Sequence, residues 1–224
     1  TGRITEVVYN RSTNRGTTWS PPFLVSEIDR FHSSCPSLAI DHLGNPHVTW
    51  FDYKYSPHWT TGDIFYRKSA DQGTTWGTID SLTSWHRAVH SWIFAKDDTL
   101  HVVWEDDRNG FDVNFEIYYR MSPNLGITWG AETRLTNALG NSYSPVVAAD
   151  KGKIHVFWND NRDISHIFAI YYKRGQYQGG VAEHSSSPIF IKQPYLWVWP
   201  NPSSGGVKVE YAMPQELKVT LRIF

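Results

Sequence analysis

The sequence is poor in cysteine, in excess charge of either sign and in long apolar runs. Cys35 is the only cysteine among 224 residues, which excludes an intrachain disulfide framework and a zinc site built from cysteines. Lys and Arg total 21 against 22 Asp and Glu, a balance that favours neither nucleic acid nor an anionic membrane as partner. No apolar run approaches the roughly 20 residues of a membrane-spanning helix. We therefore expect no membrane span, and we expect no cofactor.

Aromatic residues are the abundant class. Trp, Tyr and Phe number 11, 12 and 11 and make up 15% of the chain. Residues of this kind favour β-strands, and no segment shows a convincing helical period. The composition therefore predicts an all-β fold.

One segment occurs three times at intervals of 54 residues. It reads His47-Val-Thr-Trp50, His101-Val-Val-Trp104 and His155-Val-Phe-Trp158. Each copy continues in the pattern Trp-x-Asp-x-Lys/Arg, and each is followed by a tyrosine, at Tyr66, Tyr119 and Tyr172. Four short strands fit into each repeat, at 37–41, 47–52, 63–68 and 75–81 and again at 89–95, 100–105, 116–120 and 128–136. A repeat of this length and content predicts the blade of a β-propeller.

A second motif, Ser-x-Asp/Asn-x-Gly-x-Thr-Trp, lies between the third and fourth predicted strands and is called the turn motif below. Its shared positions are Ser12, Asn14, Gly16 and Trp19; Ser69, Asp71, Gly73 and Trp76; and Ser122, Asn124, Gly126 and Trp129. Asp or Asn accepts hydrogen bonds from nearby backbone N–H groups, and Gly takes a positive φ. Trp covers apolar surface between neighbouring sheets. These choices predict a structural role for the motif.

The turn motif resembles the Asp-box, or BNR repeat, of the sialidase-like β-propellers, and the resemblance covers about residues 1–180. It implies a partial propeller: half a blade in 1–31, two full blades to about 136, and three strands of another in 137–180. The chain begins without Met and ends inside a predicted strand, so we expect a fragment holding about three blades of a probable six. The missing outer strand would come from the N-terminal part of the complete protein.

A different composition follows residue 180. Residues 181–196 read as a linker. The segment Trp199-Pro-Asn-Pro202 and the alternating stretches 207–211 and 217–224 resemble the start of a FlgD-like immunoglobulin-like module or of a type IX secretion sorting domain. The resemblance implies a truncated β-sandwich module at 197–224, a secreted or cell-surface bacterial protein, and secretion machinery as a partner.

The basic residues of the Trp-x-Asp-x-Lys/Arg pattern are the first ligand candidates. Strands alternate in direction, so Lys54, Arg108 and Arg162 enter the face opposite the turn motifs, where sialidase-like propellers hold their active centre. A residue present in every blade can equally serve the blade, by pairing with Asp52, Asp106 or Asp160. Both interpretations stay open.

Residues that break the repeat are the second group. The loop after the second strand of one blade holds Tyr53, Tyr55, His58 and Trp59, and a connection between blades holds His86, Arg87 and His90. Another loop holds Glu105, Asp107 and Asp112. Aromatic rings stack on sugar faces and Arg binds carboxylates, so this mixture suits a carbohydrate. An ordinary polar loop is the alternative.

Catalytic residues are harder to assign. The sialidase resemblance implies three arginines on the substrate carboxylate, a Tyr nucleophile with a Glu, and an Asp acid/base. The first arginine lies in an Arg-Ile-Pro motif, which this sequence lacks. The candidate nucleophile and its partner are Tyr119 and Glu116, and the alternative for Tyr119 is a core role, because it belongs to the repeated tyrosines. His47, His101 and His155 lie at the same strand position of different blades, so we expect no metal site.

These observations give three hypotheses. The first is a secreted propeller that recognises glycans or a surface polymer, without demonstrable catalysis in this fragment. The second is an exo-α-sialidase or related glycoside hydrolase, and the third is a protein-interaction scaffold.

Overall fold

The computed structural model describes residues 4–56, 60–109, 114–162 and 169–177, together with the backbone of 208–210 and 220–222. Across these residues it contains strands and no helix, so the all-β prediction is confirmed. The predicted linker at 181–196 lies outside the described residues, as does most of the module predicted at 197–224. Two short strands, β14 (Lys208–Glu210) and β15 (Thr220–Arg222), pair antiparallel within that module's range.

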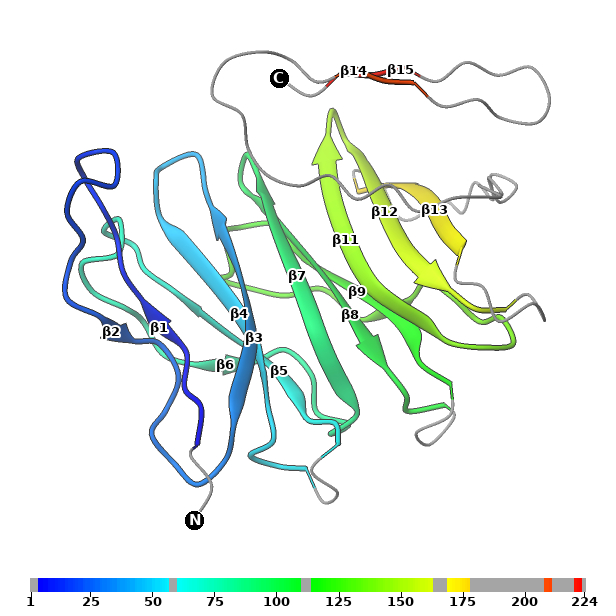
Figure 1. The fold of residues 1–224 in the computed structure, drawn as a ribbon, viewed down its shortest axis with the longest axis horizontal. Coiled ribbons are helices and arrows are strands. Elements are labelled where there is room, and N and C mark those ends of the chain that lie inside the picture. The colour runs from blue at the N-terminus through cyan, green and yellow to red at the C-terminus, as the bar shows by residue number, and fades with distance from the viewer. Residues whose placement is uncertain are drawn as a thin grey trace.

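The remaining strands form four antiparallel sheets that stand side by side in chain order (Figure 1). The first sheet holds two strands, β1 (Val8–Tyr9) and β2 (Phe23–Leu24). The second holds β3 (Ser33–Ile40), β4 (Pro46–Asp52), β5 (Asp63–Lys68) and β6 (Asp80–Ser81). The third holds β7 (Ala88–Lys96), β8 (Thr99–Asp106), β9 (Glu116–Ser122) and β10 (Thr133–Arg134). The fourth holds β11 (Ser142–Asp150), β12 (Lys153–Asp160) and β13 (Ala169–Gln176). The first strands β3, β7 and β11 are neighbours, as the 54-residue repeat predicts.

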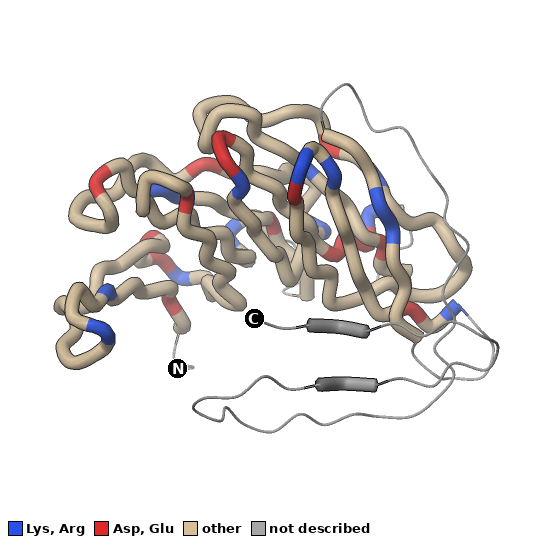
Figure 2. The backbone as a smooth tube through the Cα atoms, turned by 90° about the horizontal axis from the view of Figure 1, so that it is seen from above, with Lys and Arg blue, Asp and Glu red and all other residues tan. Residues whose placement is uncertain are grey.

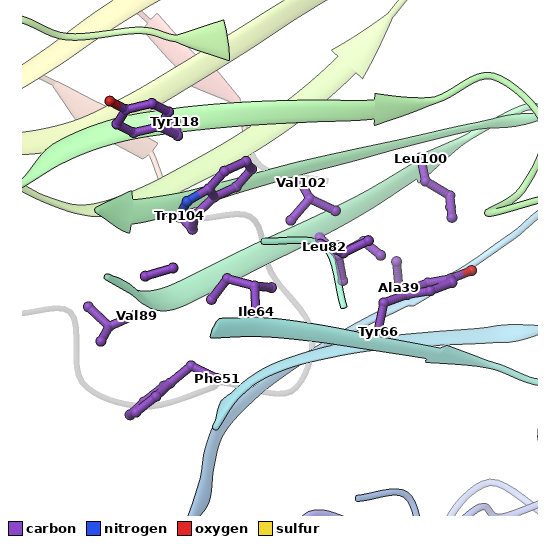
Figure 3. Close-up of a cluster of buried hydrophobic side chains, with 12 residues drawn as sticks. Ala39, Phe51, Ile64, Tyr66, Leu82, Val89, Leu100, Val102, Trp104 and Tyr118 are labelled. Atoms are coloured by element: carbon purple, nitrogen blue, oxygen red, sulfur yellow. The ribbon is translucent and has the colours of Figure 1, made fainter. Parts of the chain in front are cut away.

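The core lies between the sheets. Figure 3 shows the largest cluster, in which Phe51 and Ile64 of the β3–β6 sheet face Val102, Trp104 and their neighbours in the β7–β10 sheet. Equivalent clusters lie between β1–β2 and β3–β6 and between β7–β10 and β11–β13. Each repeat therefore buries its apolar faces only by packing on its neighbours.

The repeated histidines and tyrosines are part of this packing. The Tyr66 hydroxyl lies 2.6 Å from His47 Nδ1, and Tyr119 and Tyr172 lie 2.8 Å and 2.6 Å from Nδ1 of His101 and His155. Each pair joins the second and third strands of one sheet. The histidines thus satisfy buried hydroxyls, and the described residues contain no group of three side chains that could hold a metal ion.

The turn motif is a hydrogen-bonded loop. In the second copy Asp71 accepts from the Thr75 backbone N–H at 2.7 Å, and the Ser69 hydroxyl accepts from the Gly73 N–H at 2.8 Å. Trp76 packs edge-on against Tyr9 of the preceding sheet, with ring centroids 5.0 Å apart. The motif therefore links neighbouring sheets, as the sequence predicts.

The predicted strand boundaries were wrong in two places. The fourth strands are only two residues long, because Thr75 N–H and Thr128 N–H bond to Asp71 and Asn124 inside the turn motifs. The strand predicted at 37–41 begins at Ser33, because a β-bulge interrupts its alternation.

That bulge occurs in all three first strands. The pairing register shifts between Ser34 and Ser37, between Val89 and Trp92, and between Tyr143 and Val146. At each shift one residue has a positive φ: Cys35 at 49°, His90 at 45° and Ser144 at 52°. Bulges of this kind re-aim side chains and are common beside binding sites.

Candidate functional site

A cavity of about 620 Å³ adjoins two of these bulges, and we call it the bulge pocket. It opens among β4, β7, β8, β11 and β12, on the face opposite the turn motifs. Its lining residues are Phe51, Tyr53, Thr60, Val89, His90, Glu105, Phe115, Tyr143, Ser144 and Asn159. Four of these side chains are Phe or Tyr rings, and half of the lining residues are polar, so the pocket combines apolar walls with hydrogen-bonding groups.

The polar centre of the bulge pocket is a buried carboxylate. The Glu105 side chain is only 3% exposed, whereas that of His90 is 53% exposed. His90 Nδ1 lies 3.1 Å from Glu105 Oε2, and the Ser144 backbone N–H donates to Glu105 Oε1 at 2.7 Å. One carboxylate thus joins the bulges of β7 and β11 and holds the His90 ring in place.

The Glu105 charge also changes its neighbours. The hydrogen bond to Glu105 raises the pKa of His90 above its usual value, against a smaller opposing effect of burial. Burial raises the pKa of the Tyr143 hydroxyl and of the Cys35 thiol, and the Glu105 charge adds to both shifts. These shifts favour the charged form of His90 and the neutral forms of the hydroxyl and the thiol.

The pocket lies at the position that varies within the repeated Trp-x-Asp-x-Lys/Arg pattern. The first variable residue is Phe51, Glu105 or Asn159, and all three line the bulge pocket. The flanking Trp104 points to the other side of its strand, where its indole N–H donates to Asp106 at 3.1 Å. The repeat therefore supplies a fixed frame and presents one different side chain per sheet.

The basic residues of the pattern belong to that frame. Arg108 donates to both Asp106 oxygens, to Oδ1 at 2.8 Å, and to Glu132 at 2.5 Å, and its guanidinium lies 4.4 Å from the Tyr118 ring centroid. Arg162 repeats this arrangement with Asp160 and Tyr171. Lys54 instead forms an ion pair with Glu27. The Glu27 side chain is 60% exposed, so this ion pair is open to solvent. Their role as ligand contacts stays a prediction, and the structure supplies each with an intramolecular partner.

Tyr119 and Glu116 have separate partners. The Tyr119 hydroxyl pairs with His101, and Glu116 Oε1 accepts from Arg134 at 2.7 Å. Burial raises the pKa of Tyr119 strongly, which opposes formation of the phenolate. The geometry gives no support to a nucleophile built from these two residues.

The other predicted residues are divided between two places. Arg87 and Asp107 pair with each other, with Nη1 and Oδ2 3.6 Å apart, and neither lines the bulge pocket. Tyr55 lies in a separate crevice. His58, Trp59 and Asp112 lie outside the described residues.

Several pocket residues were not found from the sequence. Phe115 and Tyr143 belong neither to the repeated motifs nor to the groups of candidate residues, and Ser144 has no distinctive side chain. What the sequence does show is their position in the repeat. Ser144 lies one repeat after His90, and Asn159 lies one repeat after Glu105. A position-by-position alignment of the repeats would have brought these residues together.

Comparison with known structures identifies the architecture. The Hadza microbial sialidase Hz136 matches with a TM-score of 0.52 and 18% identity over 75% of this chain and 38% of its own. The GH93 α-L-arabinofuranosidase of Fusarium graminearum, in complex with arabinobiose, matches with a TM-score of 0.53 and 14% identity over 76% and 55%. A mutant Trypanosoma rangeli sialidase matches with a TM-score of 0.52 and 16% identity over 75% and 31%. The fold is a partial β-propeller.

At these identities the likeness shows the fold alone. The chain spans between 38% and 61% of the length of the first structures it matches. No family profile matches the chain, and no curated protein does. Within the described residues no helix is long and apolar enough to cross a membrane. The sheets described above are called blades below.

Proposed function

We propose that this chain recognises carbohydrate through the bulge pocket. The observation that carries the proposal is the placement of Phe51, Glu105 and Asn159, which vary between blades, in one pocket held by a repeated frame. A surface made of fixed backbone and varied side chains is what selective binding requires. The fold agrees, since the matching structures include sialidases and an arabinofuranosidase.

The chemistry of the lining suits a sugar. The half-buried rings of Tyr53, Phe115 and Tyr143 offer apolar faces for the C–H surface of a pyranose or furanose, and the buried Phe51 completes the apolar wall. His90 offers an oriented imidazole for hydroxyl groups, because Glu105 fixes one of its nitrogens. We assign His90 and the rings to ligand contact, and Glu105, being buried, to positioning His90.

A glycoside hydrolase is the second candidate function, and the buried Glu105 in a pocket favours it. Hydrolysis through paired carboxylates needs two in one site, and the described lining contributes one. Recognition therefore explains the described residues better. Release of a fluorophore from a sialoside or an arabinofuranoside by the full chain, abolished in Glu105→Gln, would replace recognition with hydrolysis.

The direct test is a glycan array probed with the full chain. We expect a restricted set of glycans to bind. His90→Asn should lose those held at the bulge pocket because it removes the imidazole, and it should still fold because Asn tolerates the positive φ of this position. Empty arrays together with captured protein partners would favour the scaffold hypothesis and overturn this one.

We further propose that the protein is secreted or displayed at a bacterial cell surface. The support is the resemblance of the segment from Trp199 to Pro202 to the opening of a FlgD-like or sorting module. Deleting 197–224 should retain the protein inside cells if this segment directs export, as fractionation followed by immunoblotting would show. Unchanged export of the deletion variant would contradict the role in sorting.

A further inference from the structure

A second cavity lies between the β3–β6 and β7–β10 blades, away from the bulge pocket. Its volume is about 550 Å³, and we call it the blade crevice. Its lining residues are Tyr55, Asp63, Ser81, Leu82, Thr83, Ser84, Trp85, His86, Arg120 and Glu132. It shares no residue with the bulge pocket.

The blade crevice contains an oriented histidine. His86 Nδ1 lies 2.5 Å from Oδ2 of Asp63, whose side chain is 1% exposed, and the His86 backbone N–H donates to Asp63 Oδ1 at 3.1 Å. Asp63 also accepts from the Thr83 hydroxyl at 2.8 Å. A carboxylate only accepts hydrogen bonds, so Nδ1 carries a proton toward Asp63 and Nε2 is the ring nitrogen left for a ligand. The side chain is 41% exposed, so the ring is held by Asp63 yet open to solvent.

This histidine is absent from the other blades. Carboxylates recur at the place of Asp63, but Glu6 accepts from Ser26 and Glu116 from Arg134. The counterpart of His86 in the next connection is Gly140, at φ +98°, whereas His86 itself has φ +59°. Glycine adopts a positive φ at least cost, and Phe31, at the corresponding place of the preceding connection, does not have one. A histidine at this φ, with its ring held by a buried carboxylate and open to solvent, points to a function beyond the turn.

The rest of the crevice indicates the class of ligand. Trp85 is 61% exposed and Tyr55 is 53% exposed, and the Tyr55 ring centroid lies 5.9 Å from that of His86. The cations are already engaged: Arg120 donates to the Gly130 and Leu82 carbonyls, and Arg108 binds Asp106 and Glu132. The crevice thus offers ring faces and hydrogen-bonding groups. Its lining cation, Arg120, is committed to two carbonyl groups, and the lining carboxylates of Asp63 and Glu132 disfavour an anionic ligand.

We propose that the blade crevice is a second carbohydrate site and that its ligand is a neutral sugar. Trp85 and Tyr55 stack on the sugar, and His86 Nε2 forms a hydrogen bond with a hydroxyl. This proposal and the proposed function both concern carbohydrate. They are otherwise independent, because the two cavities have no lining residue in common.

The test is calorimetric titration of the full chain with cellotetraose, xylotetraose and mannotetraose, and with sialyllactose as the anionic comparison. The titrations use the His90→Asn background, so that the bulge pocket is disabled. We expect one neutral tetrasaccharide to bind. Trp85→Ala should weaken it at least about tenfold, since stacking on an aromatic ring is worth roughly that much. His86→Asn should weaken it about fivefold, the loss of one hydrogen bond. Trp19→Ala, an equally exposed indole at 63%, should leave it unchanged.

The outcomes separate the two sites. Binding that survives His90→Asn and is lost with Trp85→Ala supports the blade crevice, even if the bulge pocket proves inert. Unchanged affinity in Trp85→Ala overturns the proposal, as does preferred binding of sialyllactose or no binding of the three tetrasaccharides. Thermal unfolding of each variant confirms that it folds, and folding is expected because Trp85 lies at the surface.

Discussion

At the scale of single residues, the Trp-x-Asp-x-Lys/Arg pattern divides into frame and contact positions. Asp106 and Arg108 bond to each other and belong to the frame. Glu105, the residue before Asp106, lines the bulge pocket. The sequence shows which positions repeat, so the frame could be predicted from it. It could not show that Glu105 bonds to Ser144, because that bond joins residues 39 positions apart through two bulges.

Removing Arg108 tests its role in the frame. Arg108→Ala leaves the fully buried Asp106 carboxylate without its bidentate partner, so we expect the free energy of unfolding to fall by about 3 kcal/mol. Urea denaturation at pH 7 measures this loss. Lys153→Ala, at an exposed site of β12, is the control and should change little. An unchanged unfolding free energy combined with lost glycan binding would instead make Arg108 a ligand contact.

Neutralising Glu105 tests its hold on His90. Glu105→Gln keeps the shape but removes the charge, so the pKa of His90 should fall from its raised value. A raised folded pKa gives stability that is present below the usual pKa of His and lost as the pH rises through the raised value, so the variant also loses this pH dependence. Titration of the His90 ring by NMR measures the shift. His101, whose pKa burial lowers to about 4, is the internal control. An unmoved His90 pKa would remove Glu105 from the positioning role.

At the scale of elements, the turn motif decides how closely blades approach. A Cβ on Gly126 would lie 2.1 Å from the Tyr66 hydroxyl oxygen, and one on Gly73 would lie 2.8 Å from Tyr9. The motif predicted a turn with glycine at positive φ, and this is confirmed. The second reason for glycine, contact with the preceding blade, required the structure, because sequence spacing says nothing of distances between repeats.

Two matched glycines distinguish the cost of a positive φ from the cost of contact with the preceding blade. Gly16 and Gly126 occupy the same place in the turn motif, at φ +82° and +76°, but a Cβ on Gly16 would have its nearest atom at 4.0 Å. Gly16→Ala should cost about 1 kcal/mol of unfolding free energy, from backbone strain alone. Gly126→Ala should cost about 3 kcal/mol, because the overlap with Tyr66 is added. Denaturant titration of both variants gives the comparison, and equal losses would show that contact between blades adds nothing.

At the scale of the whole molecule, the chain is a row of repeats that bury their cores against one another. Acidic and basic residues are interspersed along this row (Figure 2), as the near-neutral composition implies. The 54-residue period predicted the number and order of the described sheets. The site was predicted only in part. Glu105 was named from the sequence, but Phe51, Glu105 and Asn159 come from three sheets, and only the arrangement of these sheets in space brings them into one pocket.

The measurement that tests the central claim most directly is the affinity of the best array glycan for the full chain carrying His90→Asn. Isothermal titration calorimetry measures this affinity for His90→Asn, for the wild type and for Trp19→Ala. Thermal unfolding checks that each variant folds. We predict at least about a tenfold loss of affinity at the bulge pocket in His90→Asn, an unchanged affinity in Trp19→Ala, and similar unfolding temperatures. Wild-type affinity in His90→Asn would contradict the assignment of the bulge pocket as the carbohydrate site.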